Sequence, residues 1–131
     1  NVKAREEMSI AALEAGIAFN NASVTIIHGM SRPIGALYHI PHGLSNAMLI
    51  KECFSFALDG AYPEFGTLAK EVGVATLEDS DKEASEKLLK AMVNLVETCH
   101  VQTLQEYGVN KEDFLNHILL EIQLKIVLNK I

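Results

Sequence analysis

The stretch that decides the fold is residues 26–50, which read IIHGMSRPIGALYHIPHGLSNAMLI. Its apolar residues recur at helical spacing, and this pattern predicts one helix over 24–37 and another over 44–58. A turn is expected at 39–43, where proline and glycine fall close together. Pro33 lies inside the first of these helices, and an internal proline costs about 3 kcal/mol unless the helix kinks or breaks there. Because such a cost in an apolar segment needs a reason, we expect this stretch to carry function.

Helical patterns continue on both sides of this stretch. Upstream, an apolar stripe predicts a helix over 2–19, which ends before a candidate N-cap at Ser23. The stripe consists of Met8, Ala11, Ala12, Ala15 and Phe19. Downstream, Pro63 suits the first turn of a short helix that ends near Gly73.

Two more helices are expected beyond an acidic loop at 76–81. Ser80 and Glu83 form a capping box that opens a helix predicted to stop before Gly108. Its apolar stripe is Leu88, Met92, Leu95, Val96 and Cys99. Asn110 caps a last helix, whose stripe is Phe114, Ile118, Ile122 and Ile126. Since no segment alternates with the period of a strand, the sequence predicts an all-α bundle of five to six helices without a nucleotide-binding βαβ unit.

Length and composition narrow the class of protein. A chain of 131 residues suits a single domain over 1–131. The formal net charge of -6 argues against a nucleic-acid partner, because polyanion binders carry a basic excess. Cys53 and Cys99 form no disulfide framework, which suits a reducing cytoplasm. No apolar run approaches the roughly 18 residues of a membrane span, so no membrane partner is expected. The chain opens without Met on a helical pattern, and we expect it to be a piece of a longer protein.

The five histidines are the residues most able to carry chemistry. His100 and His117 lie on predicted amphipathic helices and are expected at the surface. His28, His39 and His42 lie in the interrupted stretch. On one continuous helix, His28 and His42 would be about 21 Å apart along the axis, but a reversal at the turn could bring both imidazoles to one metal ion. The alternative is a core histidine satisfied by a backbone carbonyl, and the chain offers no convincing third ligand.

The sequence around these histidines is similar to the signature of a known family. Residues 15–23 read AGIAFNNAS, residues 28–36 read HGMSRPIGA, and residues 40–49 read IPHGLSNAML. These segments closely resemble the signature of iron-containing alcohol dehydrogenases. The likeness is dense over residues 5–50, looser from 51 to about 117, and fades beyond that point.

This resemblance implies the C-terminal helical domain of the dehydroquinate synthase-like fold, in an enzyme whose N-terminal Rossmann-like half holds NAD(P). It also implies a divalent ion, Fe²⁺ or Zn²⁺, held by one Asp and three His. His28 and His42 match the last two ligands, while the first two belong to an upstream helix outside this chain. Phe19 matches a position that lines the substrate pocket. Arg32 falls where many members have another His near the nicotinamide, which leaves the substrate class open.

The function implied is the interconversion of a small alcohol, or a short hydroxy acid, with its aldehyde or ketone. The chain alone is expected to be inactive and to hold no tightly bound metal. Zinc glycerol dehydrogenases and dehydroquinate synthases share the helical half, but the sequence of residues 28–43 favours the iron-containing branch of the superfamily. The alternative from another class is a free-standing helical module that dimerises without catalysis. In either case we expect a homo-oligomer that buries exposed apolar residues such as Ile10, Ile17 and Ile26.

Overall fold

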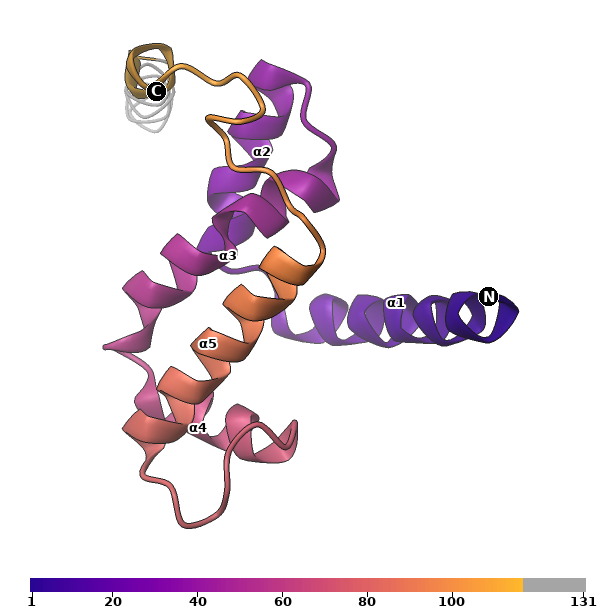
Figure 1. Cartoon of the computed structure of the whole chain (residues 1–131), viewed down its shortest axis with the longest axis vertical. Coiled ribbons are helices and arrows are strands. Elements are labelled where there is room, and N and C mark those ends of the chain that lie inside the picture. The colour runs from indigo at the N-terminus through magenta and orange to yellow at the C-terminus, as the bar shows by residue number, and fades with distance from the viewer. Residues whose placement is uncertain (117–131) are drawn as a thin grey trace.

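The computed structural model describes residues 1–116, and these residues form helices joined by loops, with no strand among them (Figure 1). The helices are α1 (Val2–Ala22), α2 (Ile26–Tyr38), α3 (His42–Leu58), α4 (Tyr62–Glu71) and α5 (Asp81–Thr98). A further helical segment occupies 111–116. The predicted all-α fold is therefore confirmed.

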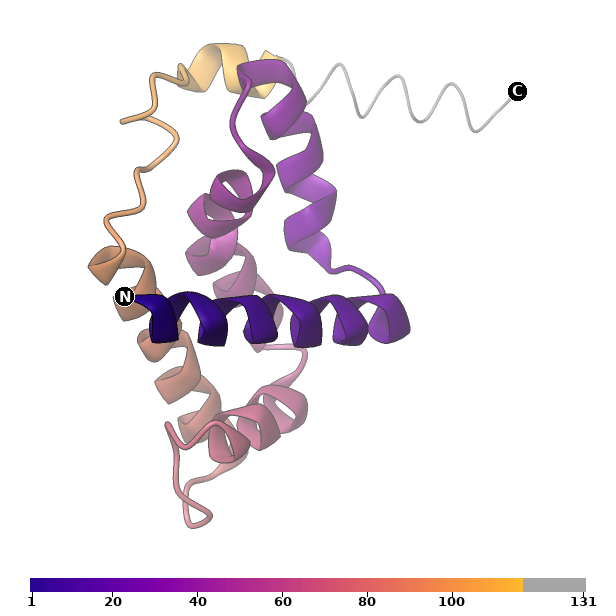
Figure 2. The ribbon, with the colours of Figure 1, turned by 90° about the vertical axis from the view of Figure 1, so that its right-hand side faces the viewer.

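Helix α1 projects from the other helices as an arm in Figure 1 and crosses in front of them in Figure 2. None of its residues is buried, although its composition is largely apolar. The helix ends at Ser23, whose N–H donates to the Phe19 carbonyl at 3.0 Å and whose φ of 66° is left-handed. After this residue the chain turns, so that α1 and α2 are bent by 110°. Within residues 1–116 no single helix is long and apolar enough to cross a membrane, and only this bent pair passes on length and composition together.

A kink or break was expected at Pro33, but helix α2 continues through this residue and does not end there. It ends at His39, which adopts a left-handed C-cap conformation with φ 54°. The chain then runs back along α2 through the buried Ile40 to Pro41. Helix α3 begins at His42, two residues before the predicted start, because the extended Pro41 acts as N-cap and its carbonyl accepts from Ser45 N–H at 2.9 Å.

The main core forms where α2, α3 and the segment after α5 meet. Its buried members are Ile27, Ile34, Ile40, Leu49, Cys53 and Val109. Cys53 is 4 % exposed, and burial, aided by the negative charge of Glu52, raises the pKa of its thiol. It is therefore an inert packing residue, as expected for a cysteine on an apolar helix face.

A second, smaller core joins α4 to α5. Ala69 and Ala84 are fully buried there, and Gly66 lies against the first residue of α5. A Cβ atom on Gly66 would come within 2.8 Å of Asp81 Cα. Small residues on both helices thus allow a very close approach of the two backbones.

Hydrogen bonds fix the start of α5 and the turn before it. The capping box predicted from Ser80 and Glu83 is confirmed. In the preceding turn, Asp79 accepts from Lys87 Nζ at 2.6 Å and from the Thr76 backbone N–H at 2.7 Å. These bonds lower the pKa of the Asp79 carboxyl to about 2, with the Lys87 bond contributing most. The turn is thus held by a carboxylate that stays ionised through most of the acid range.

The end of α5 was predicted wrongly. The helix stops at Thr98, not just before Gly108, because His100 takes a left-handed conformation with φ 52° that closes the helix. Leu95 is 62 % exposed and Cys99 is exposed, so neither belongs to the core stripe. His100 is exposed as expected, but it follows the helix. The last predicted helix is helical over 111–116, and its positions His117, Ile118, Ile122 and Ile126 lie outside the described residues.

Candidate metal centre

The structure brings His28 and His42 together. His28 is the third residue of α2 and half-buried, while His42 is the first residue of α3 and exposed. Their ring centroids are 5.4 Å apart and the ring planes are tilted by 56°. The expected reversal of the chain therefore does place the two imidazoles side by side.

The close return of the chain depends on a glycine in α2. A Cβ atom at Gly35 would lie 3.1 Å from the Ile40 carbonyl oxygen and 3.7 Å from Ser45 Oγ. A contact of 3.1 Å is tighter than ordinary van der Waals distance, so a larger residue would push the returning segment away from α2. The glycine therefore determines how close to α2 helix α3 begins, and with it the position of His42.

Two serines hold the backbone of the histidines. Each lies three residues after a histidine, and both are fully buried between α2 and α3. Ser45 Oγ donates to the His42 carbonyl at 2.9 Å, and Ser31 Oγ donates to the His28 carbonyl at 3.5 Å. Serine is small enough for close packing of the two helices and still finds a partner for its hydroxyl, which a buried polar group requires.

Phe19 reaches the site from the end of α1. Its ring centroid lies 5.9 Å from that of His28, with the planes tilted by 37°. The side chain is 48 % exposed, so one face of the ring is open. The turn at Ser23 is what folds the end of α1 back over α2. The structure thus places Phe19 against His28, and its role in a substrate pocket stays a prediction.

Asn46 is a member of the site that the sequence reasoning did not single out. Its Nδ2 lies 3.3 Å from His42 Nε2, one helical turn along α3. Its Oδ1 and His28 Nδ1 are both buried and have no hydrogen-bond partner within the described part of the chain. The signal was present as an amide four residues after a histidine on one helix, a spacing that places both on the same face. Buried polar atoms without partners are rare in native proteins, and two in one small region mark a site.

The two imidazoles fit a divalent ion. With metal–nitrogen bonds of about 2.1 Å and a tetrahedral angle, two imidazole ligands have centroids roughly 5 Å apart. The observed 5.4 Å agrees with this. Across residues 1–116 no group of three His, Cys, Asp or Glu is placed to hold an ion. These residues therefore offer half of a typical four-donor set, and further donors must come from elsewhere.

His39 and Arg32 are the other candidate residues in the stretch that holds the paired histidines. His39 is exposed at the left-handed end of α2 and makes no ring contact with His28 or His42. Arg32 is exposed on α2, four residues after His28. Four residues are about one helical turn, so Arg32 projects from the same side of α2 as His28.

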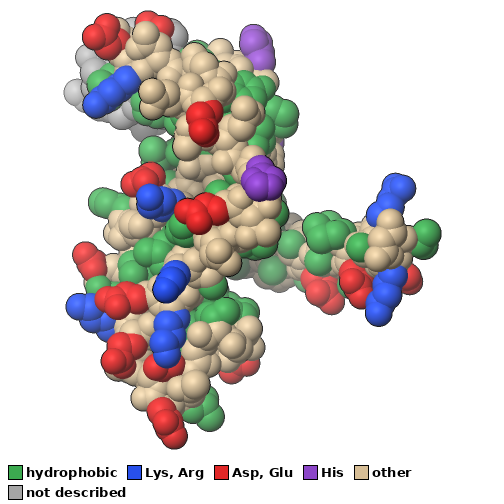
Figure 3. Space-filling view, in the orientation of Figure 1, with side chains coloured by type: hydrophobic (Ala, Val, Ile, Leu, Met, Phe, Trp, Pro, Cys, Tyr) green, Lys and Arg blue, Asp and Glu red, His purple; other side chains and the backbone are tan. Residues whose placement is uncertain are grey.

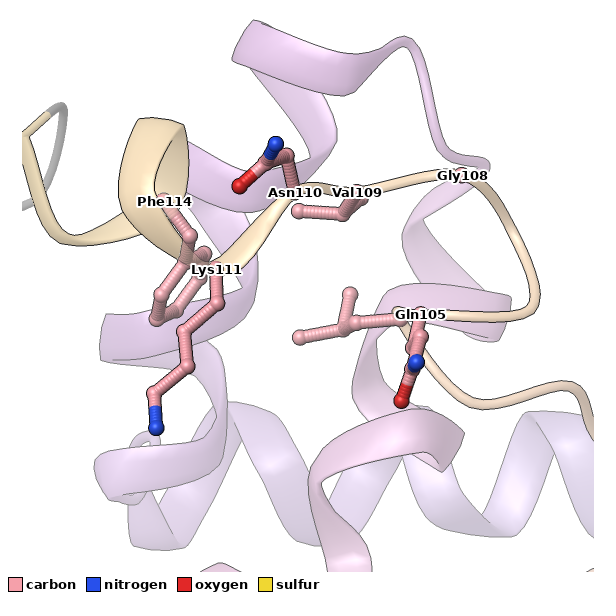
Figure 4. A pocket seen from close by; sticks show the side chains of 7 residues that line it. Gln105, Gly108, Val109, Asn110, Lys111 and Phe114 are labelled. Carbon is pink, nitrogen blue, oxygen red and sulfur yellow. The ribbon is translucent and has the colours of Figure 1, made fainter.

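A separate hollow lies after α5 (Figure 4). Gln105, Asn110, Lys111 and Phe114 are among the residues that line it. The lining contains no histidine, cysteine or carboxylate, and Lys111 is its one charged group. It offers no metal-ligating or nucleophilic side chain, so the paired histidines remain the candidate centre.

The fold and the site together define a class of protein. It is an all-helical domain in which two imidazoles are paired where two helices begin. The C-terminal model of the Fe-containing alcohol dehydrogenase family matches residues 1–127. The chain belongs to that family, and the resemblance seen in the sequence is confirmed.

Individual relatives agree with this assignment. The chain is 36% identical to 1,3-propanediol dehydrogenase of Citrobacter freundii, over 87% of this chain and 30% of that protein. It is 32% identical to NADPH-dependent butanol dehydrogenase of Clostridium saccharobutylicum, over 88% of this chain and 30% of that protein. It is 32% identical to lactaldehyde reductase of Escherichia coli, over 84% of this chain and 29% of that protein.

A solved structure is similar as well. The crystal structure of a 1,3-propanediol oxidoreductase matches with a TM-score of 0.81 and 35% identity, over 89% of this chain and 31% of that one. The predicted fold of the helical domain is thereby confirmed. The chain spans about 30% of the length of the curated relatives that it matches.

Proposed function

We propose that this chain is the metal-binding C-terminal part of a NAD(P)-dependent alcohol dehydrogenase. The observation that carries the proposal is the pair His28 and His42, with ring centroids 5.4 Å apart and a buried, unpartnered ring nitrogen on His28. Family membership and the alcohol dehydrogenases and aldehyde reductases among the relatives support the same reaction class.

In this proposal His28 and His42 supply two of the donors to a divalent ion, Fe²⁺ or Zn²⁺. Imidazole nitrogen suits both metals. When bound, the ion supplies Lewis-acid chemistry that lowers the pKa of an alcohol hydroxyl. The amide of Asn46 lies 3.3 Å from His42 Nε2 and the ring of Phe19 packs against His28, so the two side chains restrict how the imidazoles can turn.

The reaction balances as a two-electron oxidation. The alcohol loses a hydride from its carbinol carbon to the oxidised nicotinamide and a proton from its hydroxyl. The products are an aldehyde or ketone and NAD(P)H, whose chemistry belongs to the cofactor. Because residues 1–116 contain no βαβ unit, we propose that another part of the enzyme binds the dinucleotide.

The test of this proposal compares the chain alone with a full-length dehydrogenase that carries it. We expect the full-length enzyme to reduce NAD⁺ or NADP⁺ with a small alcohol, and to lose this activity on chelation and regain it with Fe²⁺ or Zn²⁺. The chain alone should bind these ions weakly and reduce neither cofactor, because two imidazoles leave most of the coordination sphere to water. Stoichiometric submicromolar metal binding by the chain alone would contradict the proposal that this chain supplies only two of the metal ligands. A full-length enzyme inactive on every alcohol would contradict the function.

We also propose that the chain self-associates, in the cytoplasm, through the arm formed by α1. Green hydrophobic side chains follow this arm in Figure 3. On this arm Ile10 and Ile17 are 52% and 57% exposed, and Ile26, at the start of α2, is 44% exposed. Apolar surface of this extent favours association with a second copy when nothing else covers it.

Sedimentation of the chain at tens of micromolar provides the measurement, and a dimer or larger species is expected. Replacing both Ile10 and Ile17 by Asp should shift the chain to monomer. Leu77→Asp is a matched control, because Leu77 is 89% exposed but lies in the loop before α5. A chain that is entirely monomeric at these concentrations would contradict the proposed self-association. It would also contradict the alternative of a free-standing module that dimerises.

A further inference from the structure

Arg32 is far from other charged residues along the sequence. Between Glu14 and Lys51 it is the only residue with a formal charge, counting histidine as neutral. The chain as a whole is acidic, with a net charge of -6. The stretch that holds the paired imidazoles thus carries one positive charge and no negative one.

The guanidinium also has no partner of its own within residues 1–116. Arg32 is exposed, and the ion pairs of the described residues join other side chains: Lys3 to Glu7, Lys70 to Asp81 and Lys87 to Asp79. No hydrogen bond is made by its side chain there. An arginine that only stabilises a helix usually pairs with a nearby acid or carbonyl, so this one is free to bind a group from outside.

Its position relates it to the candidate metal centre. Arg32 follows His28 by four residues on α2, a rise of about 6 Å on the same side of the helix. A group bound at the imidazoles and an anion bound at the guanidinium would therefore be about one helical turn apart. This separation suits the hydroxyl and the carboxylate of one short molecule.

We propose that Arg32 binds the carboxylate of the substrate, so that the enzyme prefers a short hydroxy acid, or the matching aldehyde acid, over an uncharged alcohol. The inference rests on the proposed dehydrogenase function and specifies its substrate class. The planar guanidinium offers two parallel N–H donors to a carboxylate, which a lysine or histidine cannot match. Within a chain of negative net charge, this single cation also offsets the general repulsion of an anionic substrate.

The experiment uses the full-length dehydrogenase and two probes that differ in one charge: 4-hydroxybutyrate and 1,4-butanediol. For the wild type, we expect a higher kcat/KM with the hydroxy acid. In Arg32→Met, the ratio of the two kcat/KM values should fall by about 30- to 150-fold, the range for a charge-assisted pair. Arg32→Lys should recover part of this ratio, because it restores the charge without the bidentate geometry.

Arg5→Met is the matched control. Arg5 is the other arginine of the chain, exposed on α1, so this variant removes the same charge far from the histidines along the sequence. Its ratio should equal that of the wild type. An unchanged ratio in Arg32→Met would overturn the inference, as would a rise in the KM for NAD(P)⁺ alone, which would assign the guanidinium to a cofactor phosphate. Wild-type activity with neither probe nor any other alcohol would instead overturn the proposed dehydrogenase function.

Discussion

Replacing His42 by Ala in the full-length dehydrogenase is expected to lower kcat/KM by about 1000-fold or more and to remove the bound metal. The expected loss exceeds 4 kcal/mol of transition-state stabilisation, because a Lewis acid that is lost or displaced takes its whole contribution with it. His28→Ala should have an effect of the same size, since the two rings lie together. Because the proposed function has both residues bind one ion, the double variant should be hardly worse than either single one.

A matched control for this loss is His39→Asn. His39 lies three residues before His42, is exposed, and has a left-handed backbone that Asn tolerates better than Ala. Metal content per subunit and steady-state kinetics are the measurements. Full metal occupancy and activity in His42→Ala would show that this imidazole is not a ligand. Metal loss in His39→Asn would show that the whole turn is sensitive to substitution.

The sequence allowed the helices to be predicted more reliably than their ends. Apolar spacing locates α1, α2, α3 and α5, Pro63 marks the first turn of α4, and the capping box at Ser80 fixes the start of α5. The end of α5 was missed because it depends on a left-handed histidine, His100, and histidine carries no strong signal for that conformation. The start of α3 was placed late because the sequence of the turn does not say where an extended segment becomes a helix.

The candidate site was predictable in part. The pair of histidines follows from the family wording, and a glycine at position 35 is compatible with the close return that places them together. Asn46 was not singled out, although its spacing of four residues from His42 was a signal, because only the structure shows its amide beside His42 and its oxygen buried without a partner. The exposure of α1 could not be predicted, because apolar periodicity identifies which face of a helix packs but not what packs against it.

Gly66→Ala is expected to lower the free energy of unfolding by about 2 to 3 kcal/mol, although the same change usually stabilises a helix by about 1 kcal/mol. The reason is the contact between α4 and α5. An added Cβ would lie 2.8 Å from Asp81 Cα, 2.9 Å from its Cβ and 3.0 Å from its carbonyl oxygen. Two of these atoms are backbone, so no side-chain rotation relieves the clash, and α5 must move as a whole.

Such a shift would also open the small core at this interface, where Ala69 and Ala84 are fully buried with no side-chain length to fill a gap. Thermal unfolding followed by circular dichroism provides the measurement, and a fall of about 10 °C in Tm is expected. Gly16→Ala is the matched control, because a Cβ at this position of α1 meets nothing within 4 Å. That variant should keep or slightly raise the stability. An equal Tm for the two variants would mean that α4 and α5 are not in close contact at Gly66, and that the glycine serves only the local backbone.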